Sequence, residues 1–126
     1  MWVAGTPTGP RNRIKLRLMV AAMATFEGTP TGPAGTARLV GKDLVPWLRE
    51  CDGFRGVLVL VGEEKHGVIT LWDTPKDEAS TRPARLAMHD SVSAAVGMSL
   101  VNYEVFDLPV LDVVGDPSGI AEPSRP

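Results

Sequence analysis

Cysteine is almost absent from this 126-residue sequence: Cys51 stands alone, which excludes an intramolecular disulfide framework and a zinc site built from several cysteines. A surplus of positive charge is absent as well, since 13 Lys and Arg stand against 15 Asp and Glu. Nucleic-acid binding depends on such a surplus, so we expect no nucleic acid among the partners. The two histidines lie far apart in the sequence and offer no metal-ligand spacing, so no metal is expected either.

Long apolar runs are also missing. The longest, Leu18 to Ala24, has seven residues, whereas a bilayer span needs about 20, so no membrane partner is expected. Basic residues precede this run and Ala22-Met23-Ala24 resembles a cleavage site. The stretch before that site is nevertheless too short for the apolar part of a signal peptide, and we predict a cytoplasmic protein.

Three motifs that mark common enzyme classes are missing: G-x-G-x-x-G after a strand, the P-loop, and the G-x-S-x-G nucleophile elbow. Their absence removes dinucleotide-binding, nucleotide-binding and serine-hydrolase classes of the usual kind. The remaining composition, with 44% hydrophobic and 22% charged residues, is that of an ordinary globular protein.

Glycine and proline are concentrated at both ends of the chain. Residues 1–12 and 113–126 are therefore predicted to be flexible tails, because such a density of Gly and Pro sustains neither a helix nor a strand. The hexapeptide Gly-Thr-Pro-Thr-Gly-Pro occurs at 5–10 and again at 28–33. We interpret the second copy as a surface loop within one domain spanning 13–112.

Within that domain, the periodicity of apolar residues predicts four strands at 14–26, 57–61, 68–72 and 100–105, and two helices at 37–51 and 82–96. Pro46 should kink the first helix or break it in two. For the second helix, Ser80 or Thr81 can cap the start and Pro83 lies near it. Its predicted apolar face consists of Ala84, Met88, Val92 and Ala95.

The resulting order β-α-β-β-α-β is typical of an α+β, ferredoxin-like fold: a four-stranded antiparallel sheet with both helices on one face. The first strand is apolar on both faces in its second half, and the second and third strands are rich in Val, Leu and Ile. The uncovered sheet face should therefore be buried against something. A second copy of the chain is the expected partner, because two-fold dimers are the commonest assembly.

Three stretches carry a resemblance to a known family: Asp-Gly-Phe-Arg-Gly at 52–56, Thr-Leu-Trp-Asp-Thr at 70–74 and Tyr-Glu-Val at 103–105. Over about residues 14–111 the chain resembles the antibiotic biosynthesis monooxygenase-like family of dimeric α+β barrels. The resemblance implies two sheets packed back to back and a ligand site between sheet and helices. Some members oxidise polycyclic polyketides without metal or flavin, and others degrade haem.

The haem-degrading members use an Asn on the first strand, a Trp closing the third, and a His about ten residues later. Trp72 matches the Trp, but the first strand offers no Asn and Arg82 stands where the His would be. Haem degradation is therefore not expected. The oxygenase members use Asn, Trp, Tyr and Arg around an acidic phenol, and this chain offers those residue types at Asn102, Trp72, Tyr103, and Arg82 or Arg85.

The candidate catalytic residues are Asn102 and His89, and the candidate substrate-binding residues are Trp72, Tyr103, Arg82 and Met23. Structural alternatives stand beside them: Trp72 packs in a core, Asn102 lies on a solvated strand face, and His89 lies at the border of the buried helix face. His66 is predicted to lie in solvent, in a hairpin loop at 62–67, and Cys51 to be a small buried hydrophobe.

Two functions stay open at this point. One is a cofactor-independent monooxygenase acting on a small aromatic or polyketide-like molecule, with Trp72 stacked on the substrate and Asn102 and His89 handling a proton. The other is a non-enzymatic binding or assembly module with the same dimeric barrel. They differ in whether the space between sheet and helices is open and polar or filled by Met19 and Met23.

Overall fold

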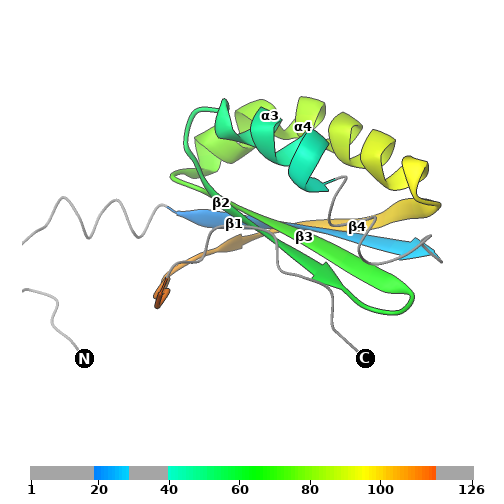
Figure 1. The fold of residues 1–126 in the computed structure, drawn as a ribbon. Helices are drawn as coiled ribbons and strands as arrows, with labels where there is room; N and C mark the ends of the chain where they lie inside the picture. The colour runs from blue at the N-terminus through cyan, green and yellow to red at the C-terminus, as the bar shows by residue number, and fades with distance from the viewer. Residues whose placement is uncertain (1–18, 29–39, 116–126) are drawn as a thin grey trace, which may run out of the picture.

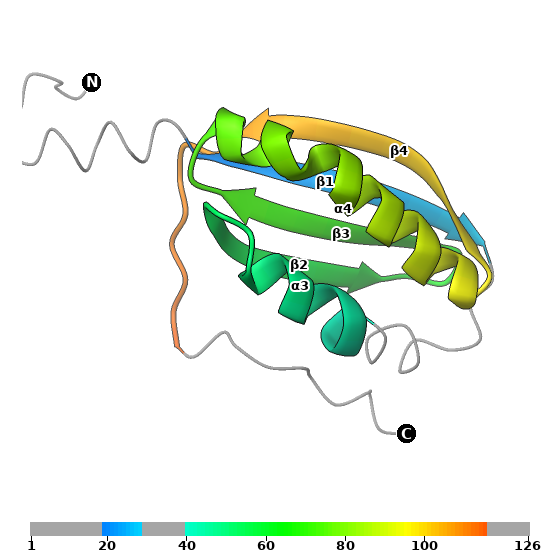
Figure 2. The ribbon, with the colours of Figure 1, turned by 90° about the horizontal axis from the view of Figure 1, so that it is seen from above.

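A computed structural model describes residues 19–28 and 40–115 of the chain. Its elements are β1 (Val20–Gly28), η1 (Val40–Leu44), α3 (Val45–Arg49), β2 (Phe54–Val61), β3 (Lys65–Trp72), α4 (Pro75–Ala95) and β4 (Met98–Asp107). The four strands form one antiparallel sheet in the order β2-β3-β1-β4. Both helices cover the same face of the sheet (Figures 1 and 2). The predicted ferredoxin-like fold is confirmed.

The central strand β1 shows how the sequence pattern sets the two faces of the sheet. Its even-numbered residues face the helices and are buried: Val20, Ala22, Ala24 and Phe26. Its odd-numbered residues face the other side, because successive side chains of a strand point in opposite directions. The period of two that predicted this strand is therefore confirmed from Val20 onward, while residues 14–18 lie outside the described part.

The first predicted helix is divided into two parts, as we expected from the presence of Pro46. A single π-helical turn, η1, ends at Leu44, and the α-helix α3 begins at Val45 with the proline in its first turn. Proline is tolerated there because the N–H groups in the first turn of a helix have no acceptor within the helix, so the missing N–H of proline costs no hydrogen bond. Leu44 and Leu48 point into the core. The predicted residues 37–39 lie outside the described part of the chain.

The second helix, α4, begins seven residues earlier than predicted. Thr74 provides the N-cap, and its hydroxyl oxygen accepts a hydrogen bond of 3.1 Å from the Asp77 N–H. The prediction that Ser80 or Thr81 caps the helix is therefore wrong. Pro83 lies inside the helix, where it leaves the carbonyl of Ala79 without its usual N–H donor. Both residues are exposed, so water can replace the missing donor.

Two of the stretches that carried the family resemblance meet at the corner where β2 and α4 begin. Gly53 has a φ of +80°, and its carbonyl oxygen accepts a hydrogen bond of 2.8 Å from the Asp73 N–H. A Cβ on Gly53 would lie 2.2 Å from Asp77 Oδ2, so no other residue fits beside the helix start. Arg55 Nε and Asp73 Oδ1, 2.6 Å apart, close the same corner with an ion pair.

The face of the sheet opposite the helices is apolar and open in the single chain. Leu58, Leu60 and Phe106 are each close to half exposed, and strand register places Met23 and Ile69 on the same face. The uncovered face predicted from the sequence is present. No helix among the described residues is long and apolar enough to cross a membrane.

Candidate functional site

The face of α4 that packs on the sheet is unusually polar. Its buried residues are Glu78, Arg85, His89 and Ser93, whereas the predicted apolar residues Ala84 and Ala95 are exposed. The buried face is therefore shifted by about one residue around the helix from the predicted apolar face. Met88 and Val92 lie at the edge of the buried face and are half-buried. Burying polar groups costs free energy unless they find partners, so the interactions of this face indicate where chemistry can occur.

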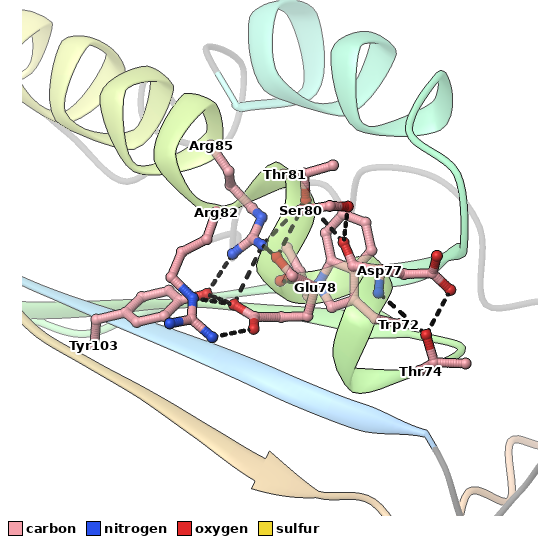
Figure 3. A network of polar contacts seen from close by, with 10 residues as sticks. Trp72, Thr74, Asp77, Glu78, Ser80, Thr81, Arg82, Arg85 and Tyr103 are labelled. Carbon is pink, nitrogen blue, oxygen red and sulfur yellow. Dashed lines mark hydrogen bonds and ion pairs between the residues drawn. The ribbon is translucent and has the colours of Figure 1, made fainter.

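Glu78 is the centre of a hydrogen-bonded network at the start of α4 (Figure 3). Its carboxylate, 1% exposed, accepts hydrogen bonds from Arg82 Nε at 2.8 Å, from Arg85 Nη2 at 3.3 Å and from the Tyr103 hydroxyl. Arg85, which is fully buried, also donates to the Tyr103 oxygen and to the Glu78 carbonyl oxygen. The network thus joins the helix to β4 through Tyr103.

The surroundings of Glu78 and Tyr103 shift their pKa values in opposite directions. Burial opposes ionisation of Glu78, but hydrogen bonds from Arg82 and Tyr103 and the charges of both arginines outweigh it and lower the pKa of Glu78. Burial raises the pKa of Tyr103, and its hydrogen bond to Glu78 adds to that effect. At neutral pH Glu78 is therefore a carboxylate and Tyr103 a neutral phenol.

Trp72 lies under this network and is fully buried. Its Nε1 donates to Thr70 Oγ1 at 2.8 Å, and Phe54 packs edge-on against the ring with centroids 5.6 Å apart. The guanidinium of Arg85 lies over the ring, 4.7 Å from its centroid. The ring face on which a flat ligand would stack is therefore covered by Arg85.

A cavity opens at the other end of α4, between its last turns, η1 and the ends of the strands. Its walls are apolar apart from His66, His89 and Ser93, and consist otherwise of Phe26, Leu44, Val59, Gly67, Val68, Val92, Val96 and Met98. The centres of water molecules can occupy about 30 Å³ of it, which is room for about two waters.

His66 is buried in the wall of this cavity, only 4% exposed, so its predicted position in solvent is wrong. The hairpin loop is shorter than predicted, because β3 already begins at Lys65. The pleat then turns His66 toward the helices, in register with Phe26 of β1 and Val61 of β2. Among the described residues neither ring nitrogen of His66 has a hydrogen-bond partner.

His89 lies in the middle of the buried helix face and not at its border, which corrects its predicted position. It is 2% exposed and packs edge-on against Phe26, with ring centroids 5.8 Å apart. Burial, reinforced by the nearby charge of Arg85, lowers the pKa of His89 to about 4. The imidazole is therefore neutral at pH 7, with one ring nitrogen as a hydrogen-bond donor and the other as an acceptor.

The six residues proposed from the sequence do not converge on one site. Trp72, Tyr103 and Arg82 meet around Glu78, and His89 lies further along the same side of the sheet. Asn102 is exposed on the opposite face, where its Nδ2 donates to Glu104 Oε1 at 3.2 Å. Met23 is paired with Glu104 on that face as well. Asn102 therefore cannot act beside His89 within one subunit, and neither Met19 nor Met23 lines the cavity under the helices.

Sequence reasoning missed Glu78 and named Arg85 only as an alternative to Arg82, although these two residues hold the network together. Both lie on the buried side of a helix whose start was placed too late, so Glu78 was outside the predicted helix altogether. The spacing of Glu78, Arg85, His89 and Ser93, at intervals of seven and four residues, is the signal that was available. It is hard to recognise because charged residues at that spacing normally mark the solvent side of a helix.

Comparison with known proteins supports the fold and goes no further. No family model matches the sequence, and no curated protein matches it. Among solved structures, the chain is similar to SnoaB, a cofactor-independent oxygenase from Streptomyces nogalater, at 13% identity and a TM-score of 0.56, covering 80% of this chain and 99% of that one. It is also similar to the monooxygenase ActVA-Orf6 of Streptomyces coelicolor, solved with nanaomycin D, at 15% identity and a TM-score of 0.55 over 82% and 98% of the two chains.

A third similar structure is NE2512, a protein of unknown function from Nitrosomonas europaea, at 17% identity and a TM-score of 0.56 over 79% and 98% of the two chains. The resemblance to antibiotic biosynthesis monooxygenase-like proteins is thus confirmed at the level of the fold. At these identities the fold is what is shared, and one fold carries many activities.

Proposed function

We propose that this protein is a cofactor-independent monooxygenase that oxidises a small aromatic or polyketide-like molecule held between the sheet and the helices. The observation that carries the proposal is an apolar cavity whose wall contains the neutral imidazole of His89, one helical turn from the buried cation Arg85. Two proteins of this fold, SnoaB and ActVA-Orf6, are described as an oxygenase and a monooxygenase.

The chemistry needs a proton acceptor and a positive charge in a space without bulk water. A phenol hydroxyl donates a hydrogen bond to the neutral imidazole of His89, which takes up the proton as an electron leaves the ring for dioxygen, because the oxidised phenol is a far stronger acid than the phenol. The buried charge of Arg85 lies outside the cavity lining and favours the negative charge that develops on the reduced dioxygen. At the ring carbon opposite the hydroxyl group, one oxygen atom then replaces the hydrogen and forms a carbonyl, which gives a quinone. The other oxygen leaves as water with that hydrogen and the proton taken up by His89. The substrate supplies all the electrons, so no outside reductant is required.

The other predicted residues take supporting roles in this proposal. Trp72 holds the Arg85 guanidinium by stacking, so it is a positioning residue and does not contact the substrate. Tyr103 and Arg82 complete the network of hydrogen bonds around Glu78 and Arg85. We assign no part in this site to Asn102 or Met23, because both lie on the far side of the sheet.

The second candidate function is a non-enzymatic module that binds a small molecule or assembles with partners. The observation that favours it is that Arg85 covers Trp72, so the network end of the space has no room for a ligand. Under this alternative the polar network only stabilises the fold, and the cavity binds its ligand without changing it.

Oxygen uptake separates the two functions. We expect the protein to consume dioxygen with electron-rich phenols, and His89→Phe to lower kcat at least 100-fold, since general acid–base groups contribute about that much. Ser91→Ala, on the exposed side of α4, should leave the rate unchanged. Binding of phenols with no oxygen uptake across the series would favour the non-enzymatic module. An undiminished rate in His89→Phe would remove His89 from the mechanism.

We further propose that two copies of the chain pair through the open sheet face. The exposed apolar side chains Leu58, Leu60 and Phe106 would be buried there, which is the usual fate of a large apolar patch. The cytoplasmic location, the flexible tails and their limits at 12 and 113 stay predictions from the sequence.

Leu58→Glu tests the dimer. An unpaired charge at a desolvated interface costs several kcal/mol, so the dissociation constant should rise about 100-fold or more. Native mass spectrometry and light scattering over a concentration series measure this shift. Ala87→Glu, on the exposed side of α4, adds the same charge elsewhere and should leave the dimer intact. A wild-type chain that is monomeric at high concentration would contradict the proposal.

A further inference from the structure

His66 is a buried polar side chain that the proposed chemistry does not use. It is 4% exposed, it lines the cavity, and neither of its ring nitrogens has a partner among the described residues. Leaving a buried donor or acceptor without a partner costs free energy, because the group has given up its hydrogen bonds to water. A neutral imidazole has one donor and one acceptor nitrogen, so a molecule that enters the cavity can recover this free energy by offering a hydroxyl or carbonyl group.

The size of the cavity limits what that molecule can be. The centres of water molecules reach about 30 Å³ of it. A water molecule needs about 10–15 Å³ measured in this way, so the space is that of about two waters, and a single ring is at the upper limit of what it can hold. A ring system of three or four fused rings does not fit within such walls.

The walls also limit the charge of the ligand. Apart from His66, His89 and Ser93 the lining is apolar, and the nearest buried cation, Arg85, is already paired with Glu78. A ligand that arrives charged would lose its hydration without gaining a counter-charge, which is costly. The cavity therefore suits a neutral ring with one polar substituent.

We propose that His66 anchors the ligand of this cavity by a hydrogen bond to a hydroxyl or carbonyl group, and that the ligand is a neutral single-ring phenol or a similar ring ketone. This inference rests on the proposed function for the location of the substrate, and adds its anchoring residue and its class. His66 supplies a contact from β3, on the sheet wall, while His89 faces the ligand from the helix.

Phenol and toluene form a matched pair of probes, since they have the same number of heavy atoms and differ in a hydroxyl against a methyl group. Each is titrated into the full-length protein labelled with ¹⁵N at histidine and ¹³C at methyl groups. We expect phenol to bind about tenfold more tightly, to shift the ring ¹⁵N signals of His66, and to shift methyl signals of Val68, Val92 and Met98.

His66→Phe should bind the two probes with equal affinity, and His66→Gln should keep part of the preference for phenol, because an amide still offers a donor and an acceptor. Lys65→Gln, one residue away and facing solvent, is the control and should behave as the wild type. If His66→Phe does not fold, the wild-type protein still tests the proposal, through its relative affinity for phenol and toluene and through the shift of the His66 ring signals.

Equal affinity for both probes in the wild type, or a phenol preference that survives in His66→Phe, overturns the anchoring role and leaves the cavity as an aromatic site. Absence of binding by either probe overturns both the anchoring role and the proposed substrate location. A phenol preference that depends on His66, in a protein that consumes no oxygen, supports the inference and overturns the oxygenase function.

Discussion

Replacement of Glu78 by alanine should lower the free energy of unfolding by about 3–5 kcal/mol. The substitution leaves the fully buried guanidinium of Arg85 without its carboxylate partner, and an unpaired buried charge is among the most destabilising defects known. Tyr103 and Thr81 can still accept hydrogen bonds from Arg85, but neither carries a compensating charge. Urea denaturation followed by circular dichroism measures the loss.

The ion pair between Arg55 and Asp73 provides a matched control on the surface. Its atoms are 2.6 Å apart, but the Arg55 side chain is 48% exposed. Arg55→Ala should therefore cost no more than about 1 kcal/mol. Equal losses for Glu78→Ala and Arg55→Ala would show that burial does not decide the strength of these pairs.

The double variant Glu78→Leu with Arg85→Met sharpens the test. Because it removes both charges together, most of the stability lost in Glu78→Ala should return. It should nevertheless abolish oxygen uptake if the buried cation has the role proposed for it. A variant that is stable and fully active would assign the network to folding alone.

Acid should destabilise the protein at pH values where most globular proteins are still unaffected. The pKa of His89 is lowered from 6.5 to about 4 by burial and by the charge of Arg85, so the folded protein binds this proton less readily than the unfolded chain does. The stabilisation is complete above pH 6.5 and is lost progressively as the pH falls from 6.5 toward 4. At 1.36 kcal/mol for each pH unit, the whole window removes about 3 kcal/mol.

Urea denaturation at a series of pH values between 7 and 5 measures the first part of this loss, about 2 kcal/mol. Glu78 does not interfere in that range. Its pKa is lowered from 4.5, so its contribution is complete above that value and is lost only at more acid pH. His89→Phe keeps an aromatic ring against Phe26 and should flatten the profile between pH 7 and 5. An equally steep profile in that variant would assign the dependence to another group.

The fold could be predicted from the sequence because β1, β2, β3 and β4 carry simple apolar patterns in the right order. The boundaries were harder, and α4 shows why. Ser80 and Thr81 are good capping residues by type, but Thr74 followed by Pro75 caps the helix first. Only the packing of Asp77 against Gly53 decides between these starts, and that contact joins residues 24 positions apart.

The site was less predictable than the fold. Trp72 and Tyr103 could be selected by residue type, but a sequence does not say that Arg85 would cover the ring of Trp72. Asn102 and Tyr103 are neighbours in the chain, and strand pleating separates them onto opposite faces of the sheet. His66 became a buried residue because β3 begins at Lys65, three positions earlier than predicted. A small error in where a strand begins, or in which face a residue occupies, can therefore place a buried side chain in solvent or an exposed one in the core.

The corner formed by Gly53, Asp73 and Asp77 bears on how such proteins are compared with each other. The stretches 52–56 and 70–74, which carry the resemblance read from the sequence, contribute Gly53, Arg55 and Asp73 to this corner, and Asp77 completes it from α4. The residues of this corner meet steric requirements of a turn, and they say nothing about a ligand. Proteins that share this fold therefore need not share a substrate, because one fold carries many activities. If the cavity binds the ligand proposed for it, the positions of His66 and His89 are the ones to compare among proteins of this fold when their ligands are in question.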